Sequence, residues 1–289
     1  HEELSWGPER AAEILRRGGG WMAADLPCDV HMPLIKEGII KEPLEADNCF
    51  DCEWIEDKSW WFKKVFNIDN EILKSDIVEL TLESLDAEAD VFINGIHIGH
   101  QKSAFYPFTA DIKKFVNEGE NILLVRMTTG VEYISEYDMA GLKKYISTES
   151  DGERGNRGDK RRAFIRKPQY VFGWDWGPRV ATCGIMKPVY IKAYKGIAIK
   201  SVYPVTKAVN KDASMQFKIE IENLDPISTV SAVVRIDVEY DEHAVLSIEK
   251  EVLLRSGVNY LDFDGTITDA KLWWPNGMGK QPLYTLKVS

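Results

Sequence analysis

The stretch Val91-Phe92-Ile93-Asn94-Gly95-Ile96-His97-Ile98 decides the fold class of this chain. Two short runs rich in β-branched and aromatic residues flank the dipeptide Asn94-Gly95. Asn-Gly readily supplies the two positive-φ positions of a type I′ turn, so the stretch predicts a tight β-hairpin. Asn94 could also be read as a sugar ligand, but its place in the turn already accounts for it.

Apolar and polar residues alternate with a period of two on both sides of this hairpin, which is typical of half-buried strands. Further strands are predicted at residues 60–66, 77–82, 121–127 and 188–194. Before them, Pro8 suits a first helical turn, and Gly18-Gly19-Gly20 ends the helix that follows. Asp29 is placed to cap a second short helix.

The last third of the chain shows the same alternation after a linker at Gly196. Strands are predicted at residues 199–204, 215–222, 230–240, 244–254 and 283–288. Several short alternating strands in this length favour an antiparallel sandwich of immunoglobulin type. The expected domains are therefore residues 1–195 and 196–289. No βαβ alternation is visible, so no (β/α)₈ barrel is expected inside this chain.

Residues 130–163 carry no strand pattern, although 132–146 could form a poor helix. A connection of this length is uncommon in a compact domain and often belongs to a binding face. Its last part, residues 154–162, is locally basic and glycine-rich. We expect that run to be a solvated loop and not a nucleic-acid-binding arm.

Charge and composition exclude several classes of function. The formal net charge of −10 argues against a nucleic-acid partner, which would require a cationic face. No apolar run is long enough for a membrane helix, so no membrane partner is expected. No signal peptide is visible, which favours the cytoplasm, but the first residue is His1 and the compartment therefore stays open.

The cysteines and histidines do not predict a metal site or a cofactor. Cys49-Phe50-Asp51-Cys52 is a single CxxC without a second ligand pair, and it lacks the βαβ setting of a thioredoxin-like motif. With Cys28 and Cys183, these residues are expected to be free, buried thiols. The five histidines show no metal-ligand spacing.

Residues 166–179, which read RKPQYVFGWDWGPR, carry the strongest functional signal. Indole faces can cover the C–H face of a pyranose, and the carboxylate of Asp175 can accept hydrogen bonds from sugar hydroxyls. Trp174-Asp175-Trp176 therefore indicates a sugar-binding site. The alternative is that both tryptophans are core residues and that Asp175 only begins a turn.

This stretch, with the residues up to Val189, resembles the N-terminal sugar-binding domain of family 2 glycoside hydrolases, and within them the β-mannosidase branch. The resemblance extends over almost the whole chain. It includes the opening motif Leu26-Pro27-Cys28-Asp29-Val30-His31, the segment 54–62, the hairpin 90–95, and the stretch from Leu272 to Tyr284. It implies an all-β fold, with a jelly-roll (galactose-binding-like) β-sandwich followed by an immunoglobulin-like β-sandwich.

The resemblance also implies what each part does. Trp174 would stack beside a terminal β-mannose and Asp175 would bind its hydroxyls, with Arg166, Trp176 and Arg179 as possible supports. The two catalytic glutamates of the family lie in a barrel expected after residue 289, so no catalytic residue is expected in this chain. Its partners would be a β-mannoside and that barrel, with no cofactor or metal.

Three positions depart from the family's pattern, namely Cys28, Pro168 and Met186, and Met186 concerns packing more than sugar binding. Trp273-Trp274-Pro275 could be taken for a second sugar platform, but we expect it to pack against the barrel. A stand-alone carbohydrate-binding module remains an alternative, as does the front end of a β-galactosidase, β-glucuronidase or exo-glucosaminidase.

Overall fold

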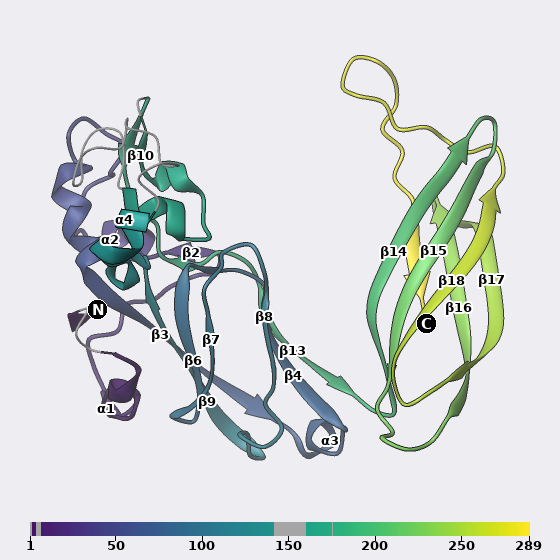
Figure 1. Cartoon of the computed structure of the whole chain (residues 1–289), viewed down its shortest axis with the longest axis horizontal. Coiled ribbons are helices and arrows are strands. Elements are labelled where there is room, and N and C mark those ends of the chain that lie inside the picture. The colour runs from purple at the N-terminus through teal and green to yellow at the C-terminus, as the bar shows by residue number, and fades with distance from the viewer. Residues whose placement is uncertain (1, 4–6, 142–159, 175) are drawn as a thin grey trace. The chain divides into compact units, whose positions relative to one another are not determined.

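The computed structural model describes residues 2–3, 7–141, 160–174 and 176–289 (Figure 1). Contacts divide the chain into two compact units, His1–Ala193 and Tyr194–Ser289. Both units are built from β-sheets, which confirms the predicted all-β fold class. Each unit is described by itself.

The first unit is a sandwich of two sheets. The larger sheet has the order β1-β3-β9-β6-β7, and the smaller has the order β13-β4-β8. The larger sheet contains β1 (Glu2–Glu3), β3 (Lys58–Ile68), β9 (Gly119–Thr128), β6 (Glu88–Ile93) and β7 (Ile96–Gln101). The smaller contains β13 (Val189–Tyr194), β4 (Ile77–Leu82) and β8 (Phe108–Asp111).

The main core of this unit lies between the two sheets. Trp60, Val91 and Val125 of the larger sheet are buried in one cluster with Leu80 and Leu82 of the smaller. Because side chains alternate along a strand, the neighbouring positions point to the opposite face of the larger sheet. There, Trp61, Phe92 and Leu124 are covered by Ala11 and Ile14.

The predicted hairpin and the two N-terminal helices are confirmed, but the residue that caps the second helix is Val30 and not, as predicted, Asp29. Asn94 and Gly95 have φ angles of 52° and 84° between β6 and β7, as a type I′ turn requires. The Asn94 amide also donates to the Phe115 carbonyl oxygen at 2.9 Å, so the side chain is occupied within the fold. The first helical segment comprises η1 (Pro8–Arg10) and α1 (Ala11–Arg16), and the second is α2 (His31–Lys36).

A small third sheet joins distant parts of the first unit. It has the order β2-β12-β5 and consists of β2 (Cys28–Asp29), β12 (Gly184–Ile185) and β5 (Leu85–Asp86). Asp29 Oδ1 accepts a hydrogen bond from the His31 backbone at the start of α2, and Asp29 Oδ2 accepts one from the Cys183 backbone. Asp29 therefore connects the opening motif to the end of the functional stretch.

The second unit is a sandwich of two three-stranded antiparallel sheets. One sheet contains β14 (Ile197–Val209), β15 (Ala213–Asn223) and β18 (Gly257–Ile267). The other contains β17 (His243–Leu254), β16 (Val230–Tyr240) and β19 (Thr285–Val288). Their facing side chains, among them Phe217, Ile236 and Phe263, form a separate core.

Several features differ from the sequence expectations, among them β8 of the smaller sheet and the strands of the small third sheet, none of which was predicted. β18 was not predicted, because its polar and glycine residues have low strand propensity, although it pairs along the whole length of β15. Within the connection 130–163, only η3 (Val131–Tyr133), α4 (Glu136–Gly141) and η5 (Lys160–Phe164) are described. The end of the predicted helix 132–146 and most of the basic run lie outside the described residues.

Candidate functional site

The Trp174 stretch forms a short hairpin. Its strands are β10 (Phe172–Trp174) and β11 (Gly177–Arg179), preceded by the helical turn η6 (Gln169–Val171). Phe172 pairs with Arg179 and Trp174 pairs with Gly177. Asp175 lies outside the described residues.

Both tryptophans are exposed. The exposed fraction is 39% for Trp174 and 76% for Trp176, so neither is a core residue and the alternative interpretation of them is wrong. Tyr170, in the adjoining helical turn, is also exposed. The hairpin therefore presents aromatic surface that a sugar ring could cover.

Arg179 and Arg166, the two predicted supports, lie in different environments. Arg179 is buried and binds Glu56 with both ends of its guanidinium group, at 2.8 Å for Nε to Oε1 and 2.5 Å for Nη2 to Oε2. Arg166 is exposed, and its guanidinium lies 5.9 Å from the ring centroid of Phe105. The structure thus places Arg179 within the base of the hairpin and Arg166 beside the loop that precedes β8.

Two cations that were not singled out from the sequence also lie under the hairpin. Arg162 is 9% exposed, which corrects the expectation of a solvated loop for this end of the basic run. Its guanidinium lies 4.9 Å from the centroid of the Trp174 ring. Lys167 is 3% exposed, and its Nζ lies 2.9 Å from Asp86 Oδ1.

The buried ring of Phe172 lies at the centre of this base. Lys167 Nζ is 5.4 Å from its centroid and the Arg179 guanidinium is 5.5 Å from it. The buried carboxylates are Glu56 and Asp86, and each faces one of these cations. Neither carboxylate is open to a substrate as an acid or a nucleophile, because each is buried and paired with a cation.

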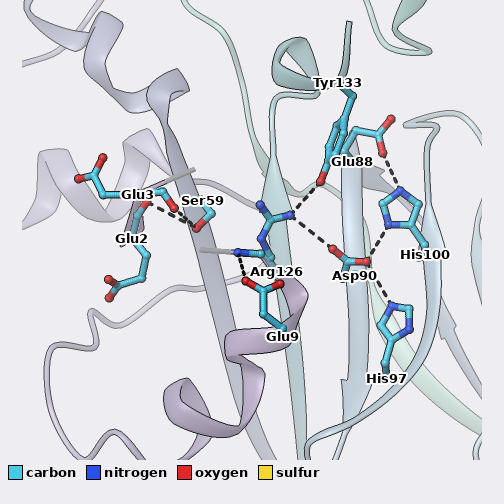
Figure 2. A network of polar contacts seen from close by, with 11 residues as sticks. Glu2, Glu3, Glu9, Ser59, Glu88, Asp90, His97, His100, Arg126 and Tyr133 are labelled. Atoms are coloured by element: carbon cyan, nitrogen blue, oxygen red, sulfur yellow. Dashed lines mark hydrogen bonds and ion pairs between the residues drawn. The ribbon is translucent and has the colours of Figure 1, made fainter. Parts of the chain in front are cut away.

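A second polar cluster lies on the outer face of the larger sheet (Figure 2). Asp90 Oδ1 is 2.8 Å from His100 Nδ1 and 3.2 Å from His97 Nε2, while Asp90 Oδ2 is 3.4 Å from Arg126 Nη1. Arg126 Nη1 also donates to the Tyr133 hydroxyl at 3.2 Å. The cluster fastens the helical turn η3 to the sheet.

His100 of this cluster is not suited to proton transfer with a substrate. Its second nitrogen, Nε2, lies 2.7 Å from Glu88 Oε2, so both ring nitrogens are engaged. Hydrogen bonds with Asp90 and then Glu88 outweigh burial and raise the pKa of His100 to about 9. At neutral pH the ring is a cation with no free lone pair, which a general base would need.

An apolar cavity of about 950 Å³ runs along β3 in the first unit. Trp21, Met22, Trp60, Phe66 and Tyr190 are among the side chains that line it.

No cluster of three or more potential metal ligands occurs among the described residues. In the same part of the chain, no helix is long and apolar enough to cross a membrane.

The four cysteines are free and buried, as predicted. Burial, followed by the negative charges of Asp29 and Asp25, raises the pKa of Cys28 to about 11. Burial also raises the pKa of Cys183 well above its ordinary value. Thiolates are the reactive species, so these thiols have the character of packing residues.

Comparisons with known proteins agree with this architecture. A family model described as glycosyl hydrolase 2 galactose-binding domain-like matches residues 6–187, and one described as glycosyl hydrolases family 2 matches residues 197–289. The chain is 28% identical over 285 residues to beta-mannosidase B of Aspergillus oryzae, covering 93% of this chain and 31% of that protein. It is 29% identical over 271 residues to beta-mannosidase of Bos taurus, covering 92% and 30% respectively.

Solved structures give the same result for the fold. The crystal structure of beta-D-mannosidase from Dictyoglomus thermophilum aligns with a TM-score of 0.78 and 29% identity, over 94% of this chain and 32% of that one. A family 2 beta-glucuronidase aligns with a TM-score of 0.55 and 19% identity, which shows a shared fold alone. The chain spans about a third or less of the length of each of these proteins.

Proposed function

Because the chain belongs to glycoside hydrolase family 2, we propose that it is the non-catalytic N-terminal part of a retaining β-mannosidase that removes terminal β-mannose. The observation that carries this proposal is the exposed Trp174 ring on a hairpin whose base is fixed by buried ion pairs. The choice of sugar is supported by the relatives that match more than nine-tenths of this chain, because these proteins are named as β-mannosidases.

In this proposal the hairpin contributes to substrate binding. The Trp174 ring stacks on the C–H face of the terminal mannose, and Asp175 accepts hydrogen bonds from its hydroxyls. Trp176, the more exposed of the two rings, borders the site, and Arg179 supports the hairpin from below. Arg166 is assigned a weaker supporting role, since its guanidinium contacts Phe105.

The chemistry of bond cleavage is assigned to another part of the polypeptide. Retaining hydrolysis needs two carboxyl groups about 5–5.5 Å apart beside the scissile bond. The buried carboxylates Glu56 and Asp86 are each bound by a cation and do not meet this need. The expected barrel, which carries the catalytic glutamates in the family, is therefore the partner that completes the site.

The loop between β18 and β19 is assigned to contacts with that barrel. It projects beyond the ends of the strands (Figure 1) and exposes Trp273, Trp274 and Met278. The Trp274 backbone donates to the Lys280 carbonyl oxygen at 2.9 Å, so the loop has a defined turn and is not an open tail. Exposed apolar patches of this kind mark contact surfaces.

Two experiments test the proposal. The whole polypeptide that contains this chain should hydrolyse nitrophenyl β-mannoside with a higher kcat/KM than the matching β-galactoside, β-glucuronide or β-glucosaminide. A higher value with any of those three would contradict the choice of sugar. Micromolar binding of a monosaccharide by this chain alone would instead favour a stand-alone carbohydrate-binding module.

A further inference from the structure

The hairpin that carries Trp174 is too small to hold its own shape. Each strand has three residues, and β10 and β11 form a two-stranded sheet with no third strand among the described residues. An isolated two-stranded hairpin is marginally stable at best in water. A defined orientation of the Trp174 ring must therefore come from contacts beneath the hairpin.

Glu56 supplies the first of these contacts. It lies in the helical segment η2 (Phe50–Asp57), 123 positions before Arg179, and is only 2% exposed. It binds two nitrogens of Arg179, and the third, Nη1, donates to the Phe172 carbonyl oxygen at 3.1 Å. Charge-assisted, bidentate contacts are the strongest and most directional of protein hydrogen bonds. Glu56 thereby fixes Arg179 across the base of the hairpin.

Arg162 supplies the second contact, nearer the ring. Its Nη1 donates to the Gly173 carbonyl oxygen at 2.9 Å, on the residue before Trp174. The same guanidinium lies 4.9 Å from the centroid of the Trp174 ring. A guanidinium within about 6 Å of an indole face is attracted by the ring's quadrupole. Arg162 therefore holds the backbone and the ring together, while the ring keeps 39% of its surface exposed.

We propose that Glu56 and Arg162 are positioning residues that fix the plane of the Trp174 ring for the sugar, Glu56 through Arg179 and Arg162 by direct contact. This inference rests on the proposed function, since it assigns Trp174 to the substrate. Both residues have their charged groups buried under the hairpin, so they act through Trp174 and do not touch the sugar. A stacking platform must be held within a few tenths of an ångström to be effective.

The first test uses this chain and does not depend on catalysis. The indole N–H signal of Trp174 is identified in a ¹⁵N spectrum by its loss in Trp174→Phe. We expect this signal to shift or broaden in Glu56→Gln and in Arg162→Lys, while most other indole signals keep their positions. The matched control is Glu249→Gln, which breaks the exposed pair between Glu249 and Arg235. An unchanged Trp174 signal in both variants would overturn the proposal.

Arg162→Lys also keeps the test decisive in case Glu56→Gln does not fold. If Glu56→Gln fails to fold, Arg162→Lys still decides the proposal, because it keeps the positive charge and removes the planar group over the ring. A dispersed spectrum with an unmoved Trp174 signal in that variant alone would then count against the positioning role.

The second test uses the whole polypeptide and a double-mutant cycle. Misplacing a substrate-binding group can lower the rate up to about 100-fold, so we expect Glu56→Gln to reduce kcat/KM by roughly 10-fold. If Glu56 acts through Trp174, its effect should fall below about 2-fold in a Trp174→Ala background. Independent, additive losses would contradict the positioning role. Unchanged kcat/KM in Trp174→Ala itself would overturn the proposed function instead.

Discussion

Asp90 and His100 are cross-strand partners on β6 and β7, and their side chains meet at 2.8 Å on the outer face of the larger sheet. Burial raises the pKa of Asp90, but hydrogen bonding and charge from His100, with Arg126 next, outweigh burial and lower it. The pKa of His100 moves the other way, to about 9. The pair is therefore ionised on both sides at neutral pH, and it fastens η3 to the sheet through Arg126 and Tyr133 (Figure 2).

The first prediction concerns stability against pH. The pKa of His100 is about 9 in the folded state, against an ordinary value of 6.5 that applies to the unfolded chain. Because the pKa is higher in the folded state, protonated His100 stabilises the fold. This contribution to the free energy of unfolding is fully present below pH 6.5 and is lost as the pH rises through 9. After allowance for solvent at this partly exposed ring, the loss should be about 1–2 kcal/mol.

Urea unfolding at about pH 6 and about pH 9.5, on either side of this window, measures the effect. His100→Gln should flatten the pH dependence of the free energy of unfolding. Parallel curves for His100→Gln and the wild type would contradict the prediction.

The second prediction concerns Gly184 on β12. A Cβ atom at this position would lie 2.1 Å from the Cys28 carbonyl oxygen and 2.9 Å from Asp29 Cα, both of which belong to the backbone. Because backbone cannot move aside as a side chain can, Gly184→Ala should destabilise the first unit by about 3 kcal/mol or more. Thermal unfolding would measure this loss. Gly18→Ala is the control, since a Cβ there would meet nothing within 4 Å.

The third prediction concerns catalysis by this chain alone. We expect no turnover of nitrophenyl β-mannoside, because the buried carboxylates Glu56 and Asp86 are held by cations and retaining hydrolysis needs a pair at the scissile bond. Pure chain is compared with a mock preparation from the same expression host. Activity above the mock that co-purifies with the chain would refute the assignment of chemistry to another part of the polypeptide.

The fourth prediction concerns binding of free mannose by this chain. One stacking ring and one carboxylate make only part of a pocket, and association must offset several kcal/mol of lost motional freedom. Calorimetric titration with mannose should therefore detect weak binding or none. A micromolar dissociation constant would mean that the hairpin forms a complete site by itself.

The fifth prediction concerns Asp175 in the whole polypeptide. Hydrogen bonds to a charged group contribute about 1.5–3 kcal/mol, so Asp175→Ala should lower kcat/KM by roughly 10- to 100-fold or more. Asp175→Asn keeps the shape and removes the charge, so partial activity would separate hydrogen bonding from electrostatics. Near-normal kinetics in both variants, with only a small change in melting temperature, would make Asp175 a turn residue.

The local sequence pattern predicted most of the strands. It predicted none of the contacts beneath the candidate site. Alternation and the Asn94-Gly95 turn predicted β6 and β7, because side-chain direction and turn geometry depend on neighbours in the sequence. β18 was not predicted, because its strand conformation is imposed by pairing with the neighbouring strand β15. The buried position of Arg162 was not predicted, because the basic sequence around it resembles that of a solvated loop.

The sequence by itself determined the all-β class, the two sandwiches and the stretch in which Trp174 lies, since each depends on residues close together in the chain or on motifs read in order. Only the tertiary structure decided that Trp174 is exposed and that Glu56 meets Arg179 across 123 positions. The physical reason is that burial of a charge is costly unless a partner is present, and that partner is chosen by the fold and not by sequence spacing. Among 46 acidic residues, no local pattern marks Glu56 as that partner.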